Sequence, residues 1–167
     1  VYLAEHDVVA EIAPTERAAA FRLTYPEKDA SYLVIDAYQH GSYVKVIPEK
    51  NMVIGYATNN HGGVPENFRN WFVVVSDTPF ETFSVIDGDN VAEGNEVAAD
   101  HALAMVGFRT RRGQEVNLKV ASSFISAEQA ELNLRELDGK SFDDVKTACR
   151  DRWNEVLGRI AVKDDNI

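Results

Sequence analysis

The stretch that decides the fold is VASSFISAEQAELNLRELDG, residues 120–139. Its first part alternates as a β-strand does, and its second part repeats apolar residues at helical spacing, with no Gly or Pro between the two. Ser126 stands at an N-cap position, and Gln129 three residues later completes a capping-box pattern. We therefore predict a strand that passes directly into a helix, which ends at Asp138-Gly139.

A second helix is predicted directly after the first. Ser141 is its N-cap candidate, and Asp143 and Asp144 in the first turn interact favourably with the helix dipole. Its apolar positions recur at helical spacing and comprise Phe142, Val145, Cys149, Trp153, Val156 and Leu157. We expect these side chains, Trp153 included, to pack against another part of the protein.

Residues 1–125 show the period-2 alternation of β-strands. The candidate strands are 8–13, 18–25, 31–37, 42–48, 51–58, 67–76, 102–110 and 114–125. Turn residues 48–51 and 111–113 each join two of these runs and predict two hairpins. The most apolar run, 67–76, is the predicted central strand. The fold class that follows is mainly β, an antiparallel β-sandwich followed by two C-terminal helices.

Two segments between the strands are predicted to be loops. NNHGGVPEN, residues 59–67, is rich in Gly and Asn, and DGDNVAEGNEVAAD, residues 87–100, is acidic. The run Asp87-Gly88-Asp89-Asn90 is only faintly like a calcium loop, which needs ligands at alternate positions and a Glu at its end. An ordinary turn is therefore predicted there.

Composition limits the classes of partner. The 167 residues carry a formal net charge of −10, which excludes a nucleic-acid backbone as the expected partner because such a partner requires a basic face. No apolar run approaches the roughly 18–20 residues of a membrane span. Cys149 is the single cysteine, so no internal disulfide is possible. Because Val1 begins inside a strand-like pattern, we expect the chain to be cut from a longer protein.

Few residues point to chemistry. The four histidines lack the spacing of a metal pair, so no metal ligand is predicted. His61, beside two glycines in the loop 59–67, is the candidate for meeting a ligand, although an exposed turn residue is the simpler interpretation. Trp71 is a second candidate, because an aromatic face can stack on a sugar ring, although a core position is more usual in an apolar strand. No catalytic residue is predicted, since neither an acid–base pair nor a nucleophile motif can be singled out.

Several segments resemble glycoside hydrolase family 92, a family of exo-α-mannosidases that are often α-1,2-specific. The similarity is most specific in VASSFISAEQAELNL, residues 120–134, and in SFDDVKTACRDRWNEVLGRIAV, residues 141–162. It extends to YLAEHDVVAEIAPTERAAAFRLTYP, residues 2–26, and to WFVVVSDTPFETF, residues 71–83. Ala121 stands where the family usually has Gly, and Ala13-Pro14 also departs from its pattern.

The resemblance implies a domain organisation and an activity. It implies that residues 1–125 form a supersandwich-like domain, that residues 126–160 are linker helices toward a C-terminal (α/α)6 catalytic domain, and that residues 161–167 are an extended tail. It implies a calcium-dependent exo-α-mannosidase that inverts configuration, acts on α-mannoside glycans and is secreted or periplasmic. The catalytic carboxyls and calcium ligands would lie outside this chain, which would shape one side of the active site through loops 59–67 and 87–100.

Two other interpretations stay open. The chain could be a non-catalytic carbohydrate-binding module, which predicts sugar binding that depends on Trp71. It could also be a structural spacer, which predicts no ligand and a dimer that covers the apolar faces of the helices.

Overall fold

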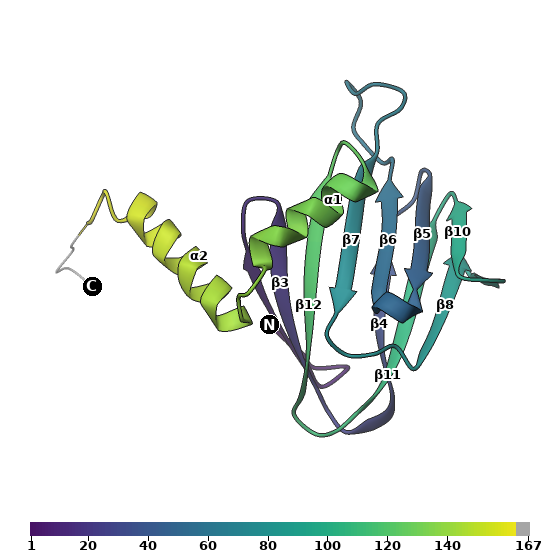
Figure 1. The fold of residues 1–167 in the computed structure, drawn as a ribbon, viewed down its shortest axis with the longest axis horizontal. Coiled ribbons are helices and arrows are strands. Elements are labelled where there is room, and N and C mark those ends of the chain that lie inside the picture. The colour runs from purple at the N-terminus through teal and green to yellow at the C-terminus, as the bar shows by residue number, and fades with distance from the viewer. Residues whose placement is uncertain (163–167) are drawn as a thin grey trace.

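The computed structural model describes residues 1–162, which form two stacked antiparallel sheets with helices on the outer face of the larger one (Figure 1). The larger sheet has the strand order β1-β2-β3-β12-β7-β6-β5-β10, and the smaller has the order β4-β11-β8-β9. The predicted sandwich with two C-terminal helices is therefore confirmed. No helix among the described residues is long and apolar enough to cross a membrane.

All strands precede α1, and the 3-10 helix η1 lies between β5 and β6. The strands are β1 (Tyr2–Leu3), β2 (Val8–Pro14), β3 (Ala18–Tyr25), β4 (Lys28–Asp36), β5 (Ser42–Ile47), β6 (Met52–Ala57), β7 (Asn70–Ser76), β8 (Thr82–Asp87), β9 (Asn90–Ala92), β10 (Glu96–Ala99), β11 (Ala102–Thr110) and β12 (Gln114–Ser123). The helices are the 3-10 helix η1 (Pro48–Lys50), α1 (Ala127–Asn133), the 3-10 helix η2 (Leu134–Leu137) and α2 (Phe142–Leu157).

The main core lies between the two sheets and is made of side chains at alternate strand positions. Val44, Val46, Val53 and Val116 of the larger sheet and Val85 and Val106 of the smaller are fully buried there. Burying a side chain of this size contributes about 1.5–3 kcal/mol. The strand predicted to be central, now β7, has β12 on one side and β6 on the other.

A second core lies on the opposite face of the larger sheet. Here the sheet presents the alanines Ala13, Ala18, Ala20 and Ala121, and the helices present Leu137, Phe142 and Val145. Because an alanine side chain is a single methyl group, the helices approach the sheet closely. α1 crosses in front of β12 and β7, while α2 runs outward from the edge of the sheet (Figure 1).

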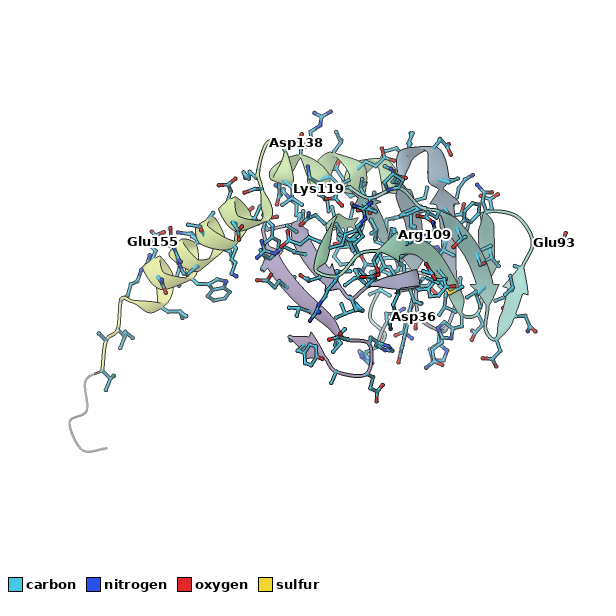
Figure 2. All side chains as sticks on the ribbon, turned by 90° about the horizontal axis from the view of Figure 1, so that it is seen from below. Asp36, Glu93, Arg109, Lys119, Asp138 and Glu155 are labelled. Atoms are coloured by element: carbon cyan, nitrogen blue, oxygen red, sulfur yellow. The ribbon has the colours of Figure 1, made fainter. Side chains whose placement is uncertain are left out.

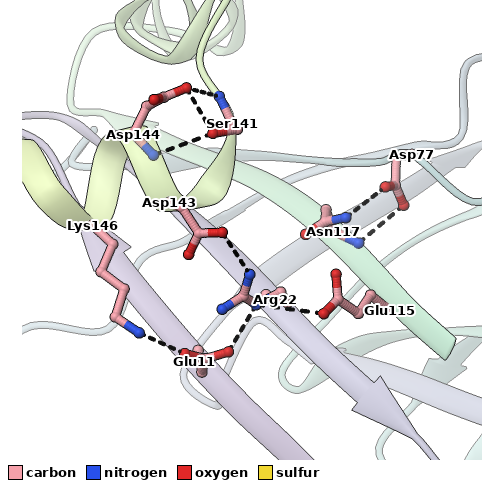
Figure 3. Close-up of polar contacts among 9 residues, drawn as sticks. All are labelled: Glu11, Arg22, Asp77, Glu115, Asn117, Ser141, Asp143, Asp144 and Lys146. Carbon is pink, nitrogen blue, oxygen red and sulfur yellow. Dashed lines mark hydrogen bonds and ion pairs between the residues drawn. The ribbon is translucent and has the colours of Figure 1, made fainter. Parts of the chain in front are cut away.

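The caps explain where the helices begin and end. The Ser126 hydroxyl accepts a hydrogen bond from the Gln129 backbone N–H at 3.2 Å, but the Gln129 side chain donates to Asn133 instead of closing the capping box. The box at Ser141 is complete, with Asp144 accepting from both the backbone and the hydroxyl of Ser141 (Figure 3). Gly139, at φ 68°, turns the chain between the two helices.

Two predictions about strands are wrong, and one strand was missed. Turn 111–113 does not close a hairpin, because β11 belongs to the smaller sheet and β12 to the larger, so this turn passes between the layers. Segment 87–100 is not one loop: it contains β9 and β10, which pair with β8 and β5. Strand β8 was not predicted at all. The ordinary turn predicted at 87–90 is confirmed, because Asp87 pairs with Asn90 across it.

Trp153 is 58% exposed, so the sandwich does not bury it, and its packing against another part of the protein stays a prediction. The sheet ends beneath the first turns of α2, so the remainder of the helix projects past it, with Asp138 near the junction and Glu155 well outside the body (Figure 2). Of the predicted tail, residues 163–167 lie outside the described part of the chain.

Two carboxylates attach the helices to the sheet. Glu136 accepts hydrogen bonds from the Thr15 hydroxyl at 2.6 Å and from the Arg17 side chain at 2.6 Å. Partial burial of Glu136 opposes ionisation, but these hydrogen bonds outweigh it and lower its pKa to about 2. Glu11 accepts from Arg22 at 2.8 Å and from Lys146 at 2.9 Å, and these bonds lower its pKa to about 2 as well.

Replacing Leu137 by Ala is expected to lower the free energy of unfolding by about 2–5 kcal/mol, because this side chain is 1% exposed in the second core. The matched change Leu132→Ala removes the same atoms at a position that is 45% exposed and should cost much less. Urea unfolding of both variants measures the difference. Equal losses would contradict the placement of α1 and η2.

The two lowered pKa values predict acid sensitivity. A carboxyl whose pKa falls on folding stabilises the native state above its unfolded pKa and loses that contribution as the pH falls toward its folded pKa. We therefore expect the contributions of Glu11 and Glu136 to disappear between about pH 4.5 and about pH 2. Urea unfolding across this range should show a shallower pH dependence in Glu136→Gln, and no such change in the exposed control Glu155→Gln.

Candidate functional site

The chain gathers one set of loops at the end of the larger sheet where β6 and β12 finish and β5 and β7 begin. These are residues 37–41, 58–69 and 124–126, which we call the loop end. The projecting turn at the top of Figure 1 is residues 58–69. Because loops at strand ends carry most binding residues while the sheet holds them in place, this end is the first candidate site.

The base of the projecting loop is tied to its neighbour by hydrogen bonds. The Thr58 hydroxyl lies 2.6 Å from the carbonyl oxygen of His40, and the Asn59 amide donates to the carbonyl of Gln39 at 3.2 Å. Beyond this base, Asn60 accepts from the backbone N–H of Gly62 at 2.7 Å. The loop therefore has a fixed base and a local turn that carries His61 at its tip.

His61 lies exposed at this tip, as the loop prediction requires. Gly62 and Gly63 after it have φ values of 93° and 77°, in the left-handed region that favours glycine. No hydrogen bond to the His61 ring occurs among the described residues. The ring is thus available to a molecule that approaches the loop end, and whether it binds substrate stays a prediction.

Trp71 lies on the helix-side face of the larger sheet and not in the main core. Cross-strand pairing places Tyr43 opposite Tyr56, and Tyr56 opposite Trp71. The ring centroids of Tyr43 and Tyr56 are 5.5 Å apart in a stacked arrangement, and those of Tyr56 and Trp71 are 4.8 Å apart edge to face. The sequence analysis missed this aromatic row, although the turn at 48–51 already sets Tyr43 against Tyr56.

Polar side chains lie against both ends of the aromatic row. The Arg69 guanidinium lies 4.9 Å from the ring centroid of Tyr56, on the side of β7. At the other end, the Tyr43 hydroxyl donates to Glu96 at 2.7 Å, and Lys45 pairs with Glu96 at 3.0 Å. Burial, together with the negative charge of Glu96, raises the pKa of Tyr43 to about 12. The ring of Tyr56 is therefore covered by its neighbours.

An exposed apolar patch adjoins the projecting loop. The rings of Phe68 and Phe124 have centroids 5.6 Å apart, and Phe124 and Ile125 are 72% and 78% exposed. Val64 in the projecting loop is 39% exposed. Exposed apolar residues that cluster in this way are typical of surfaces that contact another molecule or domain.

Metal and acid–base chemistry find no support in the described part of the chain. Among residues 1–162, no three His, Cys, Asp or Glu side chains come close enough to hold a metal ion. The resemblance places the calcium ligands outside this chain, and that stays a prediction. The carboxyl pKa values that clearly shift move downward, as at Glu11 and Glu136, whereas a general acid needs a raised pKa.

His40 lies in the loop end with His61, and two surface hollows lie outside the loop end. His101 lies 2.8 Å from Asp36 beside the smaller sheet. One hollow, of about 660 Å³, lies between turn 14–17 and α2, and the other, of about 610 Å³, lies at the opposite end of the sandwich around Arg109 and Arg111. Neither hollow is lined by His61 or Trp71.

Comparison with solved structures gives the chain clear relatives. The family GH92 inverting mannosidase BT2199 from Bacteroides thetaiotaomicron is 35% identical, with a TM-score of 0.88, over 94% of this chain and 22% of that chain. The GH92 alpha-mannosidase BT3965 from the same organism, in complex with mannoimidazole, is 26% identical, with a TM-score of 0.88, over 99% of this chain and 23% of that chain. The gh92 family glycosyl hydrolase ccman5 shares the fold at 24% identity, with a TM-score of 0.78, over 93% and 21% of the two chains.

The chain thus spans less than a quarter of the length of these structures. No curated protein matches it in sequence. The model of the glycosyl hydrolase family 92 N-terminal domain matches residues 1–123. Together with the 35% identical relative, this match shows that the chain belongs to glycoside hydrolase family 92 and carries the family's N-terminal domain.

Proposed function

We propose that the chain is the N-terminal part of an exo-α-mannosidase and that its loop end forms one side of the substrate site. The observation that carries the proposal is the 35% identity, over 94% of the chain, to a structure described as an inverting mannosidase. The exposed His61 and the adjoining apolar patch give the loop end both a polar contact for sugar hydroxyls and a surface for a second domain. Secretion or a periplasmic location accords with a substrate of this kind.

The residues of this chain bind and orient in the proposal, and they do not carry out the cleavage. Inverting glycosidases need two carboxyl groups about 6.5–9.5 Å apart, one with a raised pKa and one that activates a water. We assign the cleavage chemistry, and any calcium ion, to the helical domain expected after Ile167. The proposed contribution of the loop end is to exclude water and to position the sugar.

The test uses the longer protein that continues past Ile167. We expect it to hydrolyse aryl α-mannosides, with His61→Ala lowering kcat/KM about tenfold, which corresponds to losing one hydrogen bond to a sugar hydroxyl. His6→Ala, an exposed histidine in the turn before β2, is the matched control and should retain activity. A longer protein without α-mannosidase activity would end the proposal, and equal effects of both variants would remove His61 from it.

A second candidate function is a carbohydrate-binding module, which the aromatic row favours. The geometry of the row weakens this candidate, because Tyr43 and Arg69 lie against the ring of Tyr56 and reduce the flat aromatic face that a sugar needs.

Isothermal titration of the 167-residue chain with mannose oligosaccharides separates the two functions. We expect no saturable heat, because the substrate site is incomplete without the second domain. Saturable binding that is lost in Trp71→Ala but kept in Trp153→Ala would favour the module instead. Trp153 serves as the control because it is the other tryptophan and lies on the projecting part of α2.

A further inference from the structure

Helix α2 is attached to the sandwich only through its first turns. Phe142 and Val145 are buried in the second core, and Cys149 is half-buried. From residue 150 to the end of the helix, every residue is exposed. The apolar anchorage is therefore too small to fix the direction of a 16-residue helix by itself.

A chain of alternating charges lies beside this anchorage (Figure 3). Arg22 of β3 donates to Glu11 of β2 at 2.8 Å and to Asp143 of α2 at 3.1 Å. Lys146 of α2 donates to the second oxygen of Glu11 at 2.9 Å. We call Glu11, Arg22, Asp143 and Lys146 the ionic latch. A further carboxylate, that of Glu115 of β12, lies 3.9 Å from Arg22.

The two cations of the latch also lie close to the buried ring of Phe142. The Arg22 guanidinium lies 4.4 Å from the ring centroid of Phe142, and the Lys146 ammonium lies 5.9 Å from it. The Arg22 side chain is 17% exposed, whereas those of Asp143 and Lys146 are 70% and 56% exposed. The two partners on α2 are thus accessible to salt, which screens exposed pairs.

The segment before α2 can act as a pivot because α1 and η2 are held independently. Leu137 is 1% exposed, and the Asn133 amide donates to the carbonyl of Ser122 at 2.8 Å. Between this fixed point and α2 lie only residues 138–141, with Gly139 at φ 68°. A change of backbone angle at this glycine would turn α2 without disturbing α1.

We propose that α2 is a hinged arm whose direction is set by the ionic latch, and that weakening the latch releases α2 while the sandwich and α1 stay folded. The latch residues are then positioning residues. If α2 leads into a catalytic domain, they orient that domain, a consequence that rests on the proposed function. Release of the arm itself does not depend on that function and can be measured on this chain.

The single cysteine provides the measurement. Cys149 lines the groove between turn 14–17 and α2, so release of the arm exposes its thiol. The 167-residue chain is allowed to react with an uncharged maleimide, and the rate is followed by mass spectrometry. Arg22→Ala should raise the rate about fivefold, as expected for loss of partly exposed ion pairs. The matched control Arg150→Ala also removes one positive charge near Cys149, but this residue pairs with Asp151 of α2 itself and should leave the rate unchanged.

A second experiment tests the proposal if circular dichroism shows that Arg22→Ala does not fold. Raising NaCl from about 0.02 M to about 0.5 M shortens the screening length to a few ångströms and should raise the Cys149 rate of the unaltered chain, with its circular dichroism unchanged. Equal rates in a folded Arg22→Ala and the unaltered chain, or equal acceleration by Arg150→Ala, would overturn the proposal. A salt-independent rate would do the same.

Discussion

The structure depends on one constraint, which is that the part of the larger sheet around β3 and β12 is buried on both of its faces. Along β3 and β12, residues of one parity are large and apolar and face the smaller sheet, whereas residues of the other parity include Ala18, Ala20 and Ala121 and face the helices. Since side chains alternate across a strand, one sequence can serve two cores at once. The three layers of the molecule follow from this alternation.

The two helices meet that alanine face in different ways. α1 and η2 lie flat across β12 and β7 and bury Leu137, whereas α2 touches the sheet with Phe142 and Val145 and then leaves it. The direction of α2 is therefore assigned to charged side chains at its base. The loop end, which neither helix covers, keeps His61 and the patch around Phe124 exposed for whatever adjoins the domain.

Capping and turn residues correctly predicted the elements whose positions depend on nearby residues in the sequence. The caps at Ser126 and Ser141 located both helices, and the turn at 48–51 located the hairpin of β5 and β6. The turn at 111–113 was misread because alternation looks the same whether a strand pairs with its neighbour or passes to the other sheet. The exposure of Trp153 could not be predicted, because helical periodicity shows which face of a helix is apolar but not how far the sheet beneath it extends.

The candidate site was less predictable, because its geometry depends on how strands pair and not on the sequence pattern alone. His61 is exposed, as its glycine-rich loop suggests, but the side of β7 on which Trp71 lies depends on pairing with β6 across residues 58–69. The strand pattern alone could not supply that register. The family resemblance, in contrast, rested on several segments, and the match over residues 1–123 together with the 35% identical structure confirmed it.

The most direct test of the account is whether the alanine face receives the chain's own helices in solution. Nuclear Overhauser effects between the methyl groups of Ala20 and Ala121 and the side chains of Leu137 and Phe142 report this contact, because they require protons within about 5 Å, near the contact distance of packed side chains. The account predicts that these effects are present in the 167-residue chain. Their absence from a folded sandwich would contradict it, because the second core would then not exist.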